Sequence, residues 1–379
     1  MNVREAYFTA QGIRDFLATE RELPSYSQSL SRRLALWRRG FLSRAGVIYD
    51  FERYDPAAFV SDYQRYVGTK TINGTWSIAL SNKLFFDWLM RSSPDHRMVV
   101  HGLVRSGTFH EIDDAGDPSP PAIGGGESAA LEATVDARTS AVADAGERVA
   151  DRLDADGKLV LKWVRGGGGN NVLLCSRTDD GYEINGEPYD REALIARIDD
   201  LEDYLVCEHV EQGPYAAELY PETPNTIRAL TMYDEDREEA FIAAAVQRIG
   251  TDASGSMDNF SQGGLSARID LETGEFGRAA QLPQGSGRLE WHVRHPETGA
   301  QIEGARVPAW ETIREDILEL ASSLPTIPYV GWDLVVTDDE GSFKVIEANS
   351  YPGLKAMQVH EPLLTDDRVR RFYERHGVR

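Results

Sequence analysis

Three oxygen-bearing side chains near the end of the sequence have the residue types and spacing of a magnesium site. Asp333 stands at the start of one short apolar run, Leu334–Val336, and Glu347 and Asn349 stand at the end of another, Phe343–Ile346. A turn-rich segment separates the two runs, so the pattern predicts a β-hairpin. Antiparallel pairing would bring the three side chains together, with Glu347 and Asn349 on one face of their strand. Carboxylates that share Mg²⁺ with a substrate's phosphates are typical of phosphate chemistry.

Glu347 is the hardest of the three to explain as an ordinary surface charge. It follows the apolar pair Val345 and Ile346 and precedes a small alanine. A carboxylate among apolar neighbours rarely lacks a partner. A metal ion is the favoured partner, and an arginine is the alternative. The three acids of the turn, residues 338–340, are interpreted as solvated surface charges.

A lysine and a run of glycines form a second candidate site. Residues 159–174 predict a strand, a glycine loop and a returning strand. Consecutive glycines are entropically costly to order, and they suit a backbone that offers N–H groups to phosphate oxygens at close range. Lys162, inside the first strand, would add a positive charge to the same site. The alternative is that the glycines form a merely flexible loop. The loop is not a P-loop, since no Gly-Lys-Ser/Thr follows. The glycines are Gly166, Gly167, Gly168 and Gly169.

Two arginines lie within segments that predict strands. Arg228 and Arg248 both have apolar neighbours, so each is expected to face a cleft, where it would bind an anion. A salt bridge with one of the chain's many carboxylates is an almost equally favoured alternative for each. The polar, glycine-rich segment 258–264, which contains Asn259, is expected to be a loop that closes over a substrate.

The composition argues against several classes of protein. With 62 acidic and 40 basic residues, the 379-residue chain carries a net charge of −22, which repels nucleic acid and anionic membranes. No apolar run is as long as a membrane span, and the polar start lacks the apolar region of a secretory signal, so a cytoplasmic protein without membrane insertion is expected. The acidic excess favours a halophilic protein, adapted to a salty cytoplasm. Cys175 and Cys207 are expected to be buried free thiols.

The length of the chain is sufficient for two or three domains. Residues 1–112 are expected to form a helical lead-in and a small α/β domain, and residues 113–129 a flexible linker or loop. An Ala-rich helix is expected over about 130–153, and from residue 159 onward the patterns predict strands and mixed α/β structure. Further helices are predicted over 56–66, 191–201, 307–324 and 366–376.

These motifs, in this order, resemble the ATP-grasp superfamily. The segment Glu347-Ala-Asn-Ser-Tyr-Pro-Gly resembles its Glu-x-Asn-x-x-Pro-Gly ending. More narrowly, segments 225–231, 258–264 and 329–333 resemble the sugar-transfer-associated ATP-grasp family, which is described as related to alpha-L-glutamate ligases. Including Ser81-Asn-Lys-Leu-Phe-Phe, the likeness covers roughly residues 30–355. Trp163 departs from the pattern, in which proline often follows the strand lysine.

The resemblance implies two α+β subdomains that clamp ATP, preceded by a smaller, largely helical N-terminal domain. Residues 130–213 would form the subdomain with the glycine-rich lid, and residues 214–379 the subdomain with the metal site. Lys162 and the glycine-loop amides would hold the phosphates, and Glu208 and Val210 would frame the adenine. One or two Mg²⁺ ions, or Mn²⁺, would bind to Asp333, Glu347 and Asn349. The implied catalytic residues are Arg228, Arg248 and Asn259.

The same resemblance implies an ATP- and Mg²⁺-dependent ligase. ATP would convert a small-molecule carboxylate into an acyl phosphate, which an amine, or a sugar acceptor, then attacks; glycan or cell-surface polysaccharide modification is the implied setting. A phosphotransferase (kinase) acting on a hydroxyl or a sugar is the first alternative, and a non-catalytic ATP-binding module is the second. The sequence does not specify the acid, the acceptor or the oligomeric state.

The acidic surface predicts that stability rises with salt. A net charge of −22 implies self-repulsion that dissolved ions screen. We therefore expect the melting temperature to climb between dilute buffer and molar KCl, measured by circular dichroism. A flat or falling curve would contradict the halophilic interpretation and leave the enzyme interpretation untouched.

Overall fold

A computed structural model describes residues 3–22, 26, 28–112, 139–165, 171–283 and 287–378. The chain divides into two compact units: one comprises Met1–Ser77 and Gln212–Arg379, and the other comprises Ile78–Glu211. The segment 1–112, expected as one N-terminal part, is therefore split between the units. It is split because strand β1 (Val100–Arg105) pairs with β8 (Tyr204–Glu208) in the second unit. The expected linker 113–129 lies outside the described residues.

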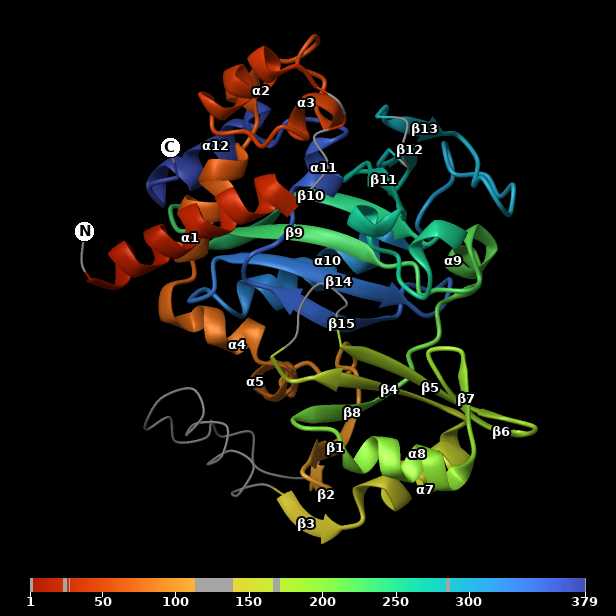
Figure 1. Ribbon diagram of the computed structural model, residues 1–379. Coiled ribbons are helices and arrows are strands. Elements are labelled where there is room, and N and C mark those ends of the chain that lie inside the picture. Colours follow the sequence, from red (N-terminus) through yellow and green to blue (C-terminus); the bar gives the residue numbers. More distant parts are fainter. Residues whose placement is uncertain are drawn as a thin grey trace. The chain divides into compact units, whose positions relative to one another are not determined.

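The first unit is built on a seven-stranded antiparallel sheet with the order β13-β12-β11-β10-β9-β14-β15 (Figure 1). Successive side chains of each strand point to opposite faces of the sheet, so each face is lined by every second residue. The strands are β9 (Ile227–Asp234), β10 (Glu239–Ile249), β11 (Leu265–Ile269), β12 (Phe276–Gln281), β13 (Glu290–His292), β14 (Tyr329–Val336) and β15 (Phe343–Asn349).

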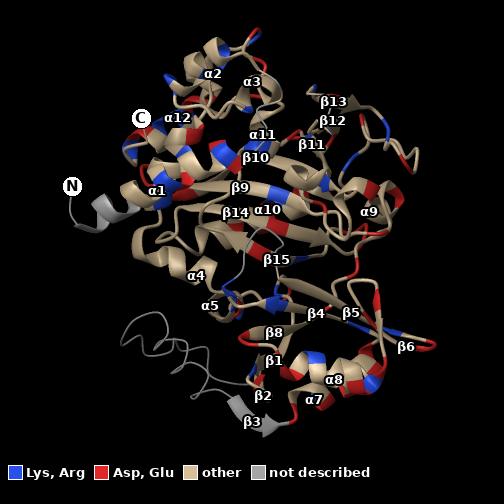
Figure 2. Ribbon diagram, viewed as in Figure 1, with Lys and Arg blue, Asp and Glu red and all other residues tan. Residues whose placement is uncertain are grey.

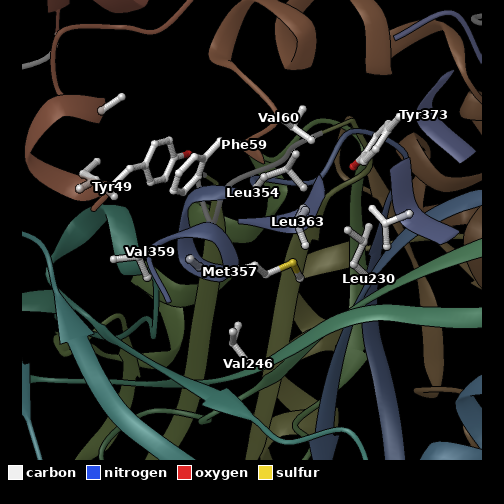
Figure 3. Packing of buried hydrophobic residues seen from close by; sticks show 14 of the residues in the cluster. Tyr49, Phe59, Val60, Leu230, Val246, Leu354, Met357, Val359, Leu363 and Tyr373 are labelled. Carbon is white, nitrogen blue, oxygen red and sulfur yellow. The ribbon is translucent and has the colours of Figure 1, made fainter. Parts of the chain in front are cut away.

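Helices and N-terminal segments of the first unit complete its core. Helix α10 (Trp310–Ser322) packs against β9 and β10. A separate cluster joins sheet residues such as Leu230 and Val246 to Met357, Tyr49 and Phe59, which Figure 3 shows packed together. The other helices are α1 (Val3–Glu22), α2 (Leu30–Trp37), α3 (Ala45–Ile48), α9 (Pro214–Leu219), α11 (Lys355–Gln358) and α12 (Asp367–Arg375), with a π-helix at Gln64–Gly68 and short 3-10 turns at Pro56–Ala58, Thr69–Thr71, Gly74–Ser77, Asp252–Ser254, Phe260–Gln262 and Leu363–Thr365.

The second unit has an eight-stranded antiparallel sheet with the order β3-β2-β1-β8-β4-β5-β6-β7. Helices α7 (Ala145–Asp156) and α8 (Arg191–Asp199) form one core with it, and helix α5 (Lys83–Met90) contributes Leu84 to another. Acidic and basic segments lie together on α7 and α8 (Figure 2). The remaining elements are α4 (Ile78–Ser81), β2 (Thr108–Ile112), β3 (Thr139–Ala143), β4 (Lys158–Trp163), β5 (Val172–Thr178), β6 (Gly181–Ile184) and β7 (Glu187–Tyr189).

Most of the predicted elements are confirmed, and two predicted helices are wrong as stated. The described part of the Ala-rich segment 130–153 contains strand β3 before α7 begins, because residues 139–143 pair with β2 and Asp144 has a left-handed φ of 73°. The segment 56–66 is not one helix: a single turn at Pro56–Ala58 is separated from a π-helix at Gln64–Gly68, because the backbone of Val60 between them bonds to Gln358 instead of continuing a helix.

Both cysteines are buried free thiols, as predicted. Burial raises the pKa of Cys175 and of Cys207 to about 12, so neither is a nucleophile at neutral pH. In the part of the chain that the structure describes, no helix is both long and apolar enough to span a membrane.

The buried amide of Gln358 should be important for stability. It accepts the N–H of Val60 at 2.8 Å and donates to the Val60 carbonyl at 2.9 Å. Gln358→Ala would leave two buried backbone groups without partners, at about 1–3 kcal/mol each. We expect a clear drop in melting temperature. The control Gln301→Ala also removes two hydrogen bonds to backbone carbonyls, but at an exposed position, and its effect should be much smaller; equal effects would contradict this account.

Candidate functional site

The predicted hairpin of β14 and β15 is confirmed, and its register brings the three predicted metal ligands together. Asp333 pairs with Glu347, and Gly331 pairs with Asn349. Directly paired residues project from the same face of a sheet, so the three oxygen-bearing side chains share one face. The strand begins four residues earlier than predicted, at Tyr329, which places Asp333 inside the strand, where it is only 3% exposed.

The neighbouring strand β9 supplies the first positive charge to this face. Arg228 pairs directly with Asp333, and its guanidinium donates two hydrogen bonds to that carboxylate, through Nε and, at 2.6 Å, through Nη2. Glu347 adds a further negative charge that acts on Arg228.

Arg248 of β10 connects Asp333 to a second buried carboxylate. Its Nη1 donates to Asp333 at 3.3 Å, and its Nη2 donates to Asp258 and, at 2.5 Å, to Oδ1 of Asn259. Asp258 is 4% exposed and also accepts the backbone N–H of Thr226 at 2.8 Å and its hydroxyl at 2.5 Å. The segment 258–264 is thus attached to the sheet through its first two residues.

The arginines therefore form the salt bridges that the sequence analysis held open as the alternative. Burial raises the pKa of Asp333, but Arg228 and Arg248 oppose this effect, and the net result is a lowered pKa. The carboxylate is consequently ionised at neutral pH.

The donor set of this face fits a hard cation. Asp333, Glu347 and Asn349 offer only oxygen ligands, the type that Mg²⁺ prefers when a nucleotide supplies the rest. No group of three or more His, Cys, Asp or Glu side chains suited to a metal occurs in the described residues. A metal site on this face would therefore need the amide oxygen of Asn349 in addition to the two carboxylates. A carboxylate has about four acceptor positions; Asp333 fills them with Arg228 twice, Arg248 once and the Asn349 amide at 3.4 Å. A cation would therefore have to replace one of these donors.

The N-terminal segment fixes the hairpin at two points, which the sequence analysis did not anticipate. Asn73 donates to the Tyr329 carbonyl at 2.7 Å and accepts its N–H at 3.1 Å, which holds the start of β14. Arg65 donates to the Pro352 carbonyl at 3.0 Å, in the turn that follows Asn349. A Cβ on Gly331 would lie 2.5 Å from Pro352, so this turn packs against β14 only because residue 331 is glycine.

The second unit contains the predicted nucleotide-binding residues. Lys162 lies in β4, is 9% exposed and contacts the sulfur of Met98 at 3.5 Å. Glu208 ends β8, where its Oε1 accepts the Val99 N–H at 2.8 Å, and Val210 follows in the connection after that strand. The predicted strand pair around the loop is confirmed, while Gly166, Gly167, Gly168 and Gly169 lie outside the described residues.

Comparison with known proteins identifies the family. The family model described as "Sugar-transfer associated ATP-grasp" matches residues 134–370, more than half of the chain. The chain belongs to this family. The superfamily resemblance found in the sequence is thereby confirmed, and the ATP-grasp fold follows from family membership. A search of curated proteins found no match.

Several solved ATP-grasp ligases are similar to this family member. D-alanyl-alanine synthetase A from Vibrio cholerae is 10% identical, with a TM-score of 0.40 over 82% of this chain and 74% of that one. D-Alanine–D-alanine ligase from Bacillus anthracis is 14% identical, with a TM-score of 0.35 over 82% and 77%. The ligase from Coxiella burnetii is 12% identical, with a TM-score of 0.34, and the match covers 79% of this chain but only 59% of that chain. TM-scores this low carry no argument about activity.

Asp258 should be essential for the buried charge network. Asp258→Asn keeps the shape of the side chain and removes the charge that faces Arg248. Leaving one member of a buried ion pair uncompensated typically costs about 3–5 kcal/mol. We expect a corresponding loss in the free energy of unfolding, measured by urea denaturation. Asp339→Asn, at an exposed turn position, is the matched control, and a similar effect of both substitutions would show that Asp258 is not a structural anchor.

Proposed function

We propose that this family member is an ATP- and Mg²⁺-dependent ligase that activates a small-molecule carboxylate as an acyl phosphate and joins it to an amine. The observation that carries the proposal is the shared sheet face of Asp333, Glu347 and Asn349, with Arg228 and Arg248 beside it. Family membership supplies the ATP-dependent chemistry. A role in glycan or cell-surface polysaccharide modification, in the cytoplasm, is part of the same proposal.

The residues have distinct roles in this proposal. Lys162 and the amides of residues 166–169 hold the phosphates of ATP, and Glu208 and Val210 frame the adenine. Asp333, Glu347 and Asn349 hold Mg²⁺, which when bound neutralises charge on the phosphates. Arg228 and Arg248, released in part from Asp333, neutralise the transferring phosphoryl group or anchor the carboxylate, and Asn259 keeps Arg248 aimed at it.

The proposed reaction needs little acid–base chemistry from the protein. An oxygen of the substrate carboxylate attacks the γ-phosphorus, the bond to the β-phosphate oxygen breaks, and ADP leaves. The amine then attacks the acyl carbon, the bond to the phosphate oxygen breaks, and inorganic phosphate leaves as the amine loses a proton. The carboxylate is already ionised at neutral pH, so the first step requires no general base.

A hydroxyl phosphotransferase, by contrast, benefits from a base, and the two nearest candidate histidines are poorly suited. Burial lowers the pKa of His360 to about 3, and its Nε2 lies 3.3 Å from the Ser266 hydroxyl. Burial also lowers the pKa of His209. A base with so low a pKa is a weak proton acceptor at neutral pH, which favours the ligase over the kinase. A set of three metal ligands speaks against a non-catalytic ATP-binding module.

Hydroxylamine trapping tests the proposed reaction. Incubated with ATP, Mg²⁺, hydroxylamine and pools of amino acids and uronic acids, the protein should release ADP and phosphate and accumulate an acyl hydroxamate. Glu347→Gln should abolish hydroxamate formation, with a smaller effect on ATP binding measured by calorimetry. A stable phosphomonoester product without any hydroxamate would contradict the ligase proposal and show that the protein is a kinase. Normal turnover by Glu347→Gln would show that Glu347 is not a metal ligand.

A further inference from the structure

A buried ion pair lies just beyond the turn that follows the metal-site strand. Lys355 begins helix α11, six residues after Asn349, and its Nζ lies 3.1 Å from Oδ1 of Asp62. The side chains are only 14% and 3% exposed. The other oxygen of Asp62 accepts the N–H of Leu42 at 2.9 Å. The carboxylate is therefore held in place by the N-terminal segment and serves as the fixed partner of the lysine.

Two further cations act on the same lysine. The charges of Arg44 and Arg65 both disfavour protonation of Lys355. Arg65 donates to the carbonyls of Pro352 and Tyr351, at 3.0 and 3.4 Å, and lies 3.9 Å from the centre of the Tyr351 ring. Neither arginine forms an ion pair with a carboxylate in the part of the chain that the structure describes, and the Nε of Arg44 is buried without a hydrogen-bond partner there.

Of the three cations, only Lys355 is paired with a carboxylate, Asp62, among the described residues, although the acidic residues of the chain outnumber its basic ones by 62 to 40. Partly buried charge without a counter-charge is costly. The cost is visible at the lysine, where burial, together with the two arginines, outweighs Asp62 and lowers the pKa to about 7. Arg44 and Arg65 therefore lack a bonded counter-charge among the described residues, and both act on the buried ammonium of Lys355.

The position of this cluster connects it to the candidate site. The turn at residues 350–353 joins the metal-site strand to Lys355, and Arg65 holds two of its carbonyls. Gly353 is exposed, and no atom lies within 4 Å of a Cβ built on it, so there is open space at the turn. The hydroxyl of Tyr351 is buried and lacks a hydrogen-bond partner among the described residues. The turn is therefore lined by a hydrogen-bond donor, Tyr351, and by Arg65, and it leads directly to Lys355.

We propose that Arg44, Arg65 and Lys355 bind an anionic group of the substrate, a carboxylate or a phosphate, other than the carboxylate that is activated. In this arrangement Asp62 orients Lys355, and the ligand supplies the missing negative charge. As far as it concerns a substrate, the proposal rests on the proposed ligase function. It restricts that substrate to acids with at least two anionic groups.

Calorimetry without ATP or Mg²⁺ tests the anion site by itself. The two probes are glutarate, which has two carboxylates, and inorganic phosphate. Comparing the two titrations shows whether the site prefers a carboxylate or a phosphate. Arg44→Gln should weaken binding of the preferred probe at least tenfold, and Arg44→Lys, which keeps the charge, should retain most of it. The control Arg39→Gln removes the same charge from an exposed position of the same segment and should change binding by less than twofold.

A second measurement does not depend on any arginine variant. The chain has only six lysines, so the signal of Lys355 can be assigned in an NMR spectrum of the ¹³C-methylated protein by comparison with Lys355→Arg. Saturation with the preferred probe should raise the pKa of Lys355 by at least one unit, because a second negative charge favours its protonated form. The pKa values of the other five lysines should change far less.

The outcomes separate this proposal from the ligase function. No binding of either probe, equal weakening by Arg44→Gln and Arg39→Gln, or an unchanged pKa of Lys355 would overturn the anion site. None of these results involves ATP, so they leave the ligase untouched. Conversely, binding at Lys355 without any hydroxamate would support the anion site while the ligase proposal fails.

Discussion

The carboxylate of Asp333 is the group around which the first unit's candidate site is organised. It is buried inside a central strand, and an isolated ionised carboxylate in that position would be strongly destabilising. Arg228 and Arg248 approach it from the two neighbouring strands on one side, and Asp258 balances the second arginine. Each of these buried charges is stable only because a neighbouring opposite charge compensates it. Several residues distant in sequence therefore depend on one another.

This compensation also constrains ligand binding. All acceptor positions of Asp333 are filled by donors of the protein, so a cation that binds to it must take the place of at least one of them. A donor displaced in this way is a guanidinium or an amide next to the site. Where the displaced donor is a guanidinium of Arg228 or Arg248, the proposed enzyme would gain a cationic group that is free to bind an anion.

The N-terminal segment has a structural role that its sequence does not suggest. Asn73 and Arg65 hold the start of β14 and the turn after β15, and Gln358 bonds to Val60 from the other side. The same segment supplies Asp62 and Arg44 beside Lys355. Residues before position 78 therefore belong to the same compact unit as the hairpin of β14 and β15, and they hold both of its ends.

Local patterns were sufficient for part of this protein. The hairpin, the shared face of Asp333, Glu347 and Asn349, the strand that contains Lys162 and most helices could be predicted, because hydrophobic periodicity and turn residues act over short stretches of chain. The family resemblance likewise rested on short motifs, such as the one that contains Glu347 and Asn349. The metal-ligand interpretation needed only the period of a strand, which is a local property.

Other features were decided by contacts between distant segments. The helix expected over 56–66 is interrupted, because Gln358, almost 300 residues away, takes the backbone bonds of Val60, and only its end, from Gln64, is part of a helix. Asp258 was not recognised as a partner of Arg248, since nothing in the sequence shows that a loop carboxylate reaches a strand arginine. The salt bridges of Arg228 with Asp333 span 105 positions. Sequence alone showed which groups carry charge; only the tertiary structure determined which charges meet, because burial and pairing depend on the packing of the whole unit.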